Sequence, residues 1–310
     1  MRLEYTDEQE QLRDEIRATM QQVMTPQRQA AVSERAEGGP AMRDCVRALA
    51  AADLLGVGWP KEFGGRGFSA IEQFIFGEEA RRVNAPIPLV TLNTVGPTLM
   101  HYGTEEQKQT FLPAILDGSV EFAIGYSEPD AGSDLASLRT TAVRDGDEWV
   151  VNGQKMFTSG AAYADYIWLA ARTDPNTKKH KGISIFIVPT SSPGFSCQPL
   201  RTMPGVSTFY TFYDNVRVPA SAIVAGENQG WQLITTQLNS NAPPWAIWVR
   251  SSHCWSRHCV GARHRTRRWP GHRQTLGAIG AGPGRGRGRG LQTHQPAGEC
   301  GHDPGCAEHG

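Results

Sequence analysis

The spacing of the apolar residues changes once along this chain of 310 residues, and the change limits the folds open to it. Before about Glu121 the apolar residues recur at a period near four, which is typical of helices with one buried face. After Glu121 they alternate at a period of two, which is typical of strands. A run of helices followed by a run of strands predicts an α+β fold with separate helical and β domains.

Residues 1–118 are predicted to form an N-terminal helical domain. Thr6 is expected to open a first amphipathic helix, and a second is expected to begin near Ser69 and to end near Arg82. Thr104 is a suitable N-cap for a third helix with the sequence EEQKQTFLPAIL, because its hydroxyl can accept a bond from a free backbone N–H.

Residues 119–228 are predicted to form a middle domain, an antiparallel β-barrel. The pair Asn152-Gly153 within it is expected to be a turn, because Asn-Gly is a strong turn signal. The predicted strands are rich in aromatic and β-branched residues. They lie in the segments EWVVNGQKMFTSG, DYIWLAART, GISIFIVPT and TFYTFYDNVRVP.

Residues 229–240 return to a helical period and are predicted to begin a C-terminal helical domain. The period is lost after residue 240. Residues 241–310 hold ten Arg, three acidic residues and no Lys, Phe, Tyr or Met. Such a composition does not support a packed core, so this domain is predicted to be truncated or scrambled, and 241–310 to be an aberrant, disordered tail.

Charge and cysteine content bear on the partners and the compartment. The formal net charge is zero, but residues 1–240 hold 21 basic and 28 acidic residues, so the main body is mildly acidic and is not expected to bind nucleic acid. That body contains only Cys45 and Cys197, which favours the reducing cytoplasm. No apolar run approaches the roughly 20 residues of a membrane span.

Two short motifs in the β domain favour a cofactor site. In AIGYSEPDAGSD a strand ends in a glycine-containing turn, where backbone N–H groups and the hydroxyls of Ser127 and Ser133 can approach a flat ring or a phosphate. In NGQKMFTSG, Phe157 is available to stack, and two hydroxyl residues follow it. Each motif alone is more typical of a capped turn or a core strand.

Together these motifs resemble the acyl-CoA dehydrogenase family over residues 1–240. The segments that carry the resemblance, in the family's order, are LGVGWPKEFGGRG, GTEEQKQTFLPAILDG, YSEPDAGSDLASLRT, GDEWVVNGQKMFTSGA and YDNVRVPASAIVAGENQGW. The resemblance implies a helical domain, a β domain and a four-helix domain, with FAD between the last two. It also implies that a carboxylate removes the α-proton of an acyl-CoA while the β-hydride passes to the flavin, giving an enoyl-CoA.

The resemblance also implies binding residues. Ser133 matches a substrate contact, Phe157 stands for the family's Trp, and Ser159 stands for its Thr. The residues that match the FAD-lining segments are Ile124, Tyr126, Ser127, Gly132, Ser133, Phe157, Thr158 and Ser159. The implied partners are an acyl-CoA substrate, electron-transfer flavoprotein as electron acceptor, and further subunits of a homo- or hetero-tetramer; no metal is implied.

The stretch GPGRGRGRGL has three interpretations. It could be an RNA-binding tail, although it has three Gly-Arg repeats and no interleaved aromatic residues. It could belong to a metal-binding tail, although its cysteines and histidines fit no familiar zinc spacing. Its third interpretation is a shifted reading frame. Back-translated with GC-rich codons and read in another frame, Gly271–Pro296 becomes AIDRPWVQSALARVEVEVEVCKLINQ, which continues the family pattern.

A second shift of the reading frame explains the sequence directly after residue 240. Residues Asn241–Trp245 hide the family's ERATL once one lost base is supplied, so two single-base losses would account for both frames. The resemblance implies that the C-terminal domain supplies the catalytic Glu and part of the FAD and acyl sites. None of these is encoded in frame in residues 241–310, so the catalytic residue stays unassigned and we expect no turnover from this chain. The alternative is a non-catalytic binding or scaffold protein of the same fold.

Overall fold

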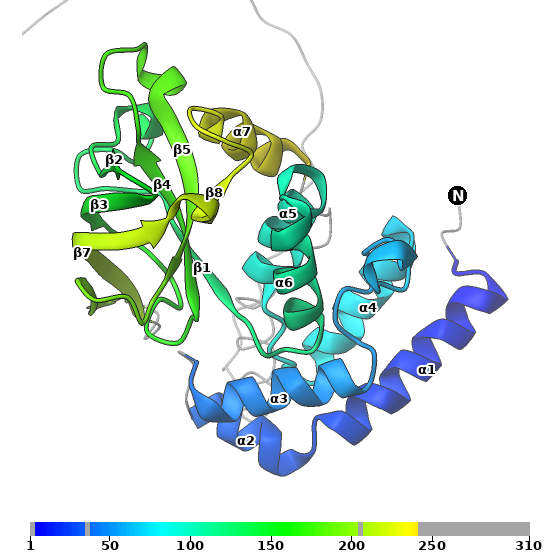
Figure 1. Ribbon diagram of the computed structural model, residues 1–310. Helices are drawn as coiled ribbons and strands as arrows, with labels where there is room; N and C mark the ends of the chain where they lie inside the picture. The colour runs from blue at the N-terminus through cyan, green and yellow to red at the C-terminus, as the bar shows by residue number, and fades with distance from the viewer. Residues whose placement is uncertain (1–3, 35–37, 204–206, 241–310) are drawn as a thin grey trace, which may run out of the picture. The chain divides into compact units, whose positions relative to one another are not determined.

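The N-terminal part of the chain is helical, as its sequence predicts. The computed structural model describes residues 4–34, 38–203 and 207–240. The helices of this part are drawn from blue to cyan in Figure 1. They are α1 (Asp7–Val23), α2 (Pro26–Glu34), α3 (Pro40–Ala51), α4 (Ala70–Arg82), α5 (Gly96–Tyr102) and α6 (Glu105–Leu116), with short helical turns at Lys61–Phe63 and Thr91–Val95.

Three of these helices begin with the same reciprocal cap, which confirms the predicted starts. Each N-cap hydroxyl accepts a bond from the backbone N–H three residues later, and the side chain at that later position accepts one from the N-cap backbone. The pairs are Thr6 with Gln9, Ser69 with Glu72 and Thr104 with Gln107.

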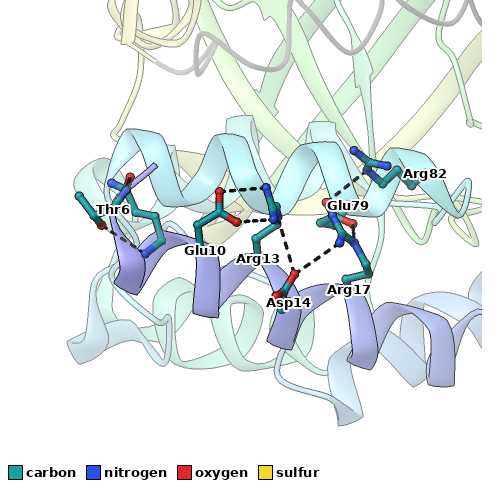
Figure 2. Close-up of polar contacts among 8 residues, drawn as sticks. Thr6, Glu10, Arg13, Asp14, Arg17, Glu79 and Arg82 are labelled. Carbon is teal, nitrogen blue, oxygen red and sulfur yellow. Dashed lines mark hydrogen bonds and ion pairs between the residues drawn. The ribbon is translucent and has the colours of Figure 1, made fainter. Parts of the chain in front are cut away.

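A buried carboxylate joins α1 to α4. Glu79 is 2% exposed and accepts two hydrogen bonds from Arg17, each of 2.9 Å. Arg82, one turn further along α4, forms a second ion pair with Glu79 at 3.2 Å. Figure 2 shows both arginines directed at this carboxylate, with Asp14 beside Arg17. The pairing neutralises a charge that burial alone would make costly.

The glycine-rich loop before α4 is held by one tryptophan. Trp59 is 4% exposed, and its indole N–H donates to the carbonyl of Leu92 over 2.7 Å. Gly96, the first residue of α5, lies so close that an added Cβ would come within 2.1 Å of the Trp59 ring. This close approach fixes the loop against the helices.

The second part of the described chain is an eight-stranded sheet, drawn from green to yellow in Figure 1. Its strands follow the path β6-β7-β3-β2-β4-β5-β8, and β1 pairs with β4 beside that path. The described pairs form an open path with ends at β6 and β8. The bounds are β1 (Phe122–Gly125), β2 (Thr141–Asp145), β3 (Glu148–Lys155), β4 (Tyr166–Arg172), β5 (Ile183–Pro189), β6 (Phe195–Arg201), β7 (Ser207–Pro219) and β8 (Ile223–Val224).

Most strand pairs are antiparallel, as the sequence predicts, but two are parallel. β1 pairs with β4 in parallel, and β2 meets β4 in parallel at Thr141 and Arg172. The predicted turn at Asn152-Gly153 is wrong, because both residues lie inside β3 at a bulge against β7. Gly153 has φ 145°, and an added Cβ would lie 2.7 Å from the Cα of Thr140. Glycine is needed there for a close backbone approach rather than for a hairpin.

The helical and β parts are joined by hydrogen bonds from backbone and side chains. Phe122 N–H donates to Thr91 Oγ1 over 2.9 Å, and Gln107 Nε2 donates to the carbonyls of Ser221 and Ile223, each over 2.9 Å. Arg43 on α3 forms a bidentate pair with Asp165, just before β4. Buried apolar residues from both parts form one continuous cluster.

Helix α7 (Gly230–Ser240) follows the sheet, where the sequence predicts a return to helix. Figure 1 shows it beside β5 and the end of α5. Leu233 and Ile234 are buried in the cluster shared by the helices and the sheet. The predicted tail of residues 241–310 lies outside the described residues.

Candidate functional site

Two backbone segments that the sequence singles out lie side by side. The first follows β1 and begins with Tyr126 and Ser127, and the second follows β3 and begins with Met156 and Phe157. The N–H of Met156 donates to the carbonyl of Ser127 over 2.8 Å. The structure therefore joins the two candidate motifs through the main chain, although Ser127 and Met156 are 29 residues apart in the sequence.

A buried ion pair lies behind this junction. Lys155 is 0% exposed and Glu128 is 6% exposed, and Lys155 Nζ lies 2.8 Å from Glu128 Oε1. The same ammonium donates to the carbonyl of Tyr126 over 3.1 Å. Glu128 also accepts the backbone N–H groups of Arg139 (2.6 Å) and Thr140 (2.9 Å). Glu128 is thus a structural carboxylate in the turn after β1, and the pair ties three backbone segments together.

The two charges shift each other's protonation. Burial alone would raise the pKa of the Glu128 carboxyl, but the Lys155 ammonium and two backbone N–H groups bring that pKa below its usual value. Burial lowers the pKa of Lys155 to about 8, and Glu128 opposes this change. We expect both groups to be ionised at neutral pH, because each is the other's closest counter-charge.

The side chain of Tyr126 is directed at α7. Its phenol oxygen accepts the indole N–H of Trp168 over 3.1 Å and forms a short hydrogen bond with Gln237 Oε1 on α7. Gln237 in turn donates to Thr98 Oγ1 on α5 over 2.9 Å. Burial raises the pKa of the Tyr126 phenol, so it stays protonated and donates to Gln237.

The second segment presents an exposed aromatic ring. Phe157 is 56% exposed and has φ 59°, in the left-handed region that large residues rarely adopt. Holding a residue there costs about 1–3 kcal/mol, and such strain clusters at ligand sites. Ser159 is exposed beside it, with its hydroxyl 3.3 Å from that of Thr208. Thr158 is buried, and its hydroxyl has no hydrogen-bond partner among the described residues.

The remaining candidates follow β1. Ile124 is half-buried in β1, in register with Trp168 of β4, and Ser127 is half-buried in the loop after it. Gly132 and Ser133 are exposed in the same loop. Exposed Phe157, Ser159 and Ser133 therefore belong to the two joined segments, whereas the buried Thr158 side chain does not face solvent.

These residues fit a flavin. Its isoalloxazine is flat and needs an aromatic surface, and its ring nitrogens and phosphates need hydroxyl and backbone donors. Phe157 offers an exposed ring, Ser159 an exposed hydroxyl, and the loop at Gly132 and Ser133 an exposed backbone.

Sequence interpretation did not assign a role to Lys155. The signal was available, since Trp149, Val151 and Lys155 occupy the second, fourth and eighth positions of β3 and all are buried. A lysine on a buried strand face needs a counter-charge, and Glu128 is the acid of the neighbouring motif. The bond from Tyr126 to Gln237 had no such signal, because it depends on how α7 packs.

Other site types are not found in the part of the chain that the structure describes. The described residues contain no group of three or more His, Cys, Asp or Glu side chains placed to hold a metal ion. Among the same residues, no helix is both long and apolar enough to cross a bilayer.

Two family models match this chain. The acyl-CoA dehydrogenase N-terminal domain matches residues 6–119, and the acyl-CoA dehydrogenase middle domain matches residues 123–216. Acyl-CoA dehydrogenase FadE29 of Mycobacterium tuberculosis (strain ATCC 25618 / H37Rv) is 57% identical over 241 residues, which cover 77% of this chain and 62% of that protein. The chain thus spans less than two thirds of the length of this relative.

Solved structures agree with the family models. The structure described as Tcur3481-Tcur3483 steroid ACAD is 51% identical, with a TM-score of 0.77 over 85% of this chain and 69% of that one. The ChsE4-ChsE5 complex from Mycobacterium tuberculosis is 50% identical, with a TM-score of 0.73 over 83% of this chain and 68% of that one. This chain therefore belongs to the acyl-CoA dehydrogenase family of oxidoreductases, whose members are FAD-dependent flavoproteins.

Proposed function

We propose that this chain derives from an FAD-dependent dehydrogenase that oxidises the Cα–Cβ bond of an acyl-CoA thioester with a polycyclic, steroid-derived acyl group. We assign residues 1–118 to its helical domain, 119–228 to its β domain and 229–240 to the start of its C-terminal domain. The observation that carries the proposal is the junction of the two site segments at Ser127 and Met156. The steroid assignment is drawn from the relative described as a steroid ACAD.

Each exposed site residue has a proposed task. Phe157 covers the flavin ring, Ser159 donates a hydrogen bond to its edge, and the loop that ends in Ser133 binds phosphate and substrate. The other proposed flavin contacts are Ile124, Tyr126, Ser127, Gly132 and Thr158. Bound FAD supplies a ring that accepts the β-hydride. The buried Lys155–Glu128 pair holds the two segments in register, because it bonds to both.

The general base is not assigned to a described residue. Removal of the α-proton needs a carboxylate within hydrogen-bond reach, and a general base contributes about 10²–10⁴-fold in rate. Glu128 directly follows Ser127, but its bonds to Lys155, Arg139 and Thr140 already occupy it. We therefore propose that the base is lost with the shifted reading frame after Ser240.

One experiment tests this function on the chain as it exists. The purified chain is titrated with FAD, and acyl-CoA-dependent reduction of an electron acceptor is measured. We expect weak or absent FAD binding and no turnover. Resequencing of the DNA for residues 239–262, followed by restoration of the two proposed lost bases, is expected to restore yellow colour and turnover. Robust turnover of the unrepaired chain, or none after repair, would refute the proposal.

The binding partners of this chain are part of the same proposal. A complex of ChsE4 with ChsE5 is among the solved relatives, which favours assembly with a second chain into a tetramer. Electron-transfer flavoprotein is the proposed electron acceptor, and a cytoplasmic location stays a prediction. The same observation favours a second candidate function, in which this chain is a non-catalytic subunit. Copurification of the unrepaired chain with an active dehydrogenase subunit, and an uninterrupted reading frame, would support that candidate.

A further inference from the structure

Three charged side chains meet where the helical part contacts the β part. Arg43 on α3 donates to both carboxylate oxygens of Asp165, each over 3.0 Å. Glu121 directly precedes β1, and its backbone N–H donates to the same carboxylate over 2.9 Å. Asp165 therefore links α3 to the start of β1. We call Arg43, Glu121 and Asp165 the Arg43 cluster.

The Arg43 cluster also ends the loop that begins at Ser159. Arg43 Nη2 donates to the carbonyl of Tyr163 over 2.6 Å. The ring of Tyr163 lies against Gly38, two residues before α3, so closely that a Cβ added at Gly38 would come within 2.6 Å of that ring. The helical part thus holds this loop at Tyr163 and at Asp165. The strength of the Arg43 cluster therefore bears on the segment that presents Ser159.

The Arg43 cluster has one positive charge for two negative ones. Arg43 forms its two-point contact with Asp165, and the half-buried Glu121 carboxylate has no hydrogen bond of its own among the described residues. Two charged groups act on Glu121 in this part of the chain, Arg43 from α3 and Asp165 from the segment before β4. Burial raises the pKa of the Glu121 carboxyl and Asp165 raises it further, whereas Arg43 lowers it; the result lies above the usual value.

The direction of this shift fixes how the contact responds to pH. Because the pKa of Glu121 is higher in the closed contact than in water, the closed contact binds more protons. Its stability is greatest below the ordinary glutamate pKa of about 4.3, and part of it is lost as the pH rises through the raised value. Arg43 stays a cation throughout, because its hydrogen bonds to Asp165 raise its pKa.

We propose that the Arg43 cluster is an acid-strengthened latch between the helical and β parts. Protonation of Glu121 removes the excess negative charge and tightens the contact, and ionisation loosens it. The loop from Ser159 to Asp165 is therefore held more firmly at mildly acidic pH. This inference goes beyond the proposed function and stands without it, since it depends on contacts within the chain and on no ligand.

The test is hydrogen–deuterium exchange of the purified chain at about pH 5 and about pH 7.5, followed in peptides that contain Glu121 or Tyr166. Each rate is divided by that of an unstructured peptide of the same sequence. The amides of Asp165 and Tyr166 report on the contact, because both donate to the carbonyl of Glu121. Arg43 and Asp165 are partly exposed, which limits the effect. We expect about threefold more frequent opening at the higher pH, which corresponds to about 0.7 kcal/mol.

Three variants separate the groups. E121Q cannot ionise, so its protection should be the same at both pH values and should exceed that of the parent chain at the higher one. The matched control D117N removes a charge from an exposed position four residues earlier and should keep the parent's pH dependence. D165N removes the acid that Arg43 binds and should open more often than the parent chain at both pH values.

Four results would overturn the inference. They are equal protection of the parent chain at the two pH values, the parent's pH dependence in E121Q, loss of that dependence in D117N, and unchanged protection in D165N. The comparison of the parent chain with itself needs no substitution, so it decides even if a variant fails to fold.

Discussion

Replacing Lys155 by Met tests whether the buried ion pair supports the site. The change leaves the Glu128 carboxylate buried with two backbone N–H partners and no counter-charge. Removing one partner of a buried pair destabilises a protein by about 3–5 kcal/mol. Protonation of Glu128 would remove the unpaired charge, and from an ordinary pKa near 4.3 it costs about 3.7 kcal/mol at pH 7. The cost of the unpaired charge and the cost of protonation are similar, so we expect the free energy of unfolding to fall by about 3–4 kcal/mol.

Because Glu128 can be protonated, the stability of K155M should depend on pH. In K155M the folded-state pKa of Glu128 rises above its unfolded value, so the folded state binds more protons and its stability increases as the pH falls towards 4.3. In the parent chain Glu128 is ionised in both states over this range. The deficit of K155M should therefore shrink by about 2 kcal/mol between pH 7 and pH 5.5.

Urea unfolding followed by tryptophan fluorescence measures both quantities. The control K108M breaks an ion pair of 2.9 Å whose acid, Glu105, is 80% exposed, so it should cost less than about 1 kcal/mol. The double variant E128Q/K155M should be more stable than K155M, because no charge is left buried. A deficit of K155M below about 1 kcal/mol at pH 7, or one that is independent of pH, would refute the reasoning.

Further predictions concern the pH dependence of Glu128 in the parent chain and two other contacts. In the parent chain the folded-state pKa of Glu128 lies below its unfolded value, so the stability that Glu128 contributes is present above about pH 4.3 and is lost as the pH falls through the folded pKa. The difference in stability between the parent chain and E128Q, measured from urea midpoints, should therefore become smaller below about pH 4.3. A difference that stays constant would contradict this. Tyr126→Phe should cost about 1–3 kcal/mol, because Gln237 loses its partner, and should speed amide exchange in α7. Gly96→Ala should lower the Tm through an overpacking cost of about 1–3 kcal/mol against Trp59, and an unchanged Tm would show that the ring yields freely.

The elements that could be predicted from sequence are those with local signals. The starts at Thr6, Ser69 and Thr104 depend on residues three apart, and the structure confirms each. The apolar strands β4 and β5 were equally clear. β6 was not predicted, because its sequence FSCQPLR has exposed polar residues and a proline.

The rest depends on long-range packing. The local sequence Asn152-Gly153 predicts a turn, but the two residues lie within β3, and the pairing of β3 with β7 places a bulge there. For the candidate site, the sequence indicated both segments and the resemblance implied their partner FAD, yet neither indicated the ion pair that joins them. Lys155 and Glu128 are 27 residues apart, and no short-range rule links them.

The hydrogen-bonded contact of α7 has a consequence for protein engineering. Tyr126, Thr98 and Tyr102, which bond to α7 side chains, all precede α7 in the chain. These three partners are therefore already present when α7 is synthesised. Ser240 is for that reason a suitable graft point. Helical segments of related dehydrogenases could be joined there and compared on one unchanged platform.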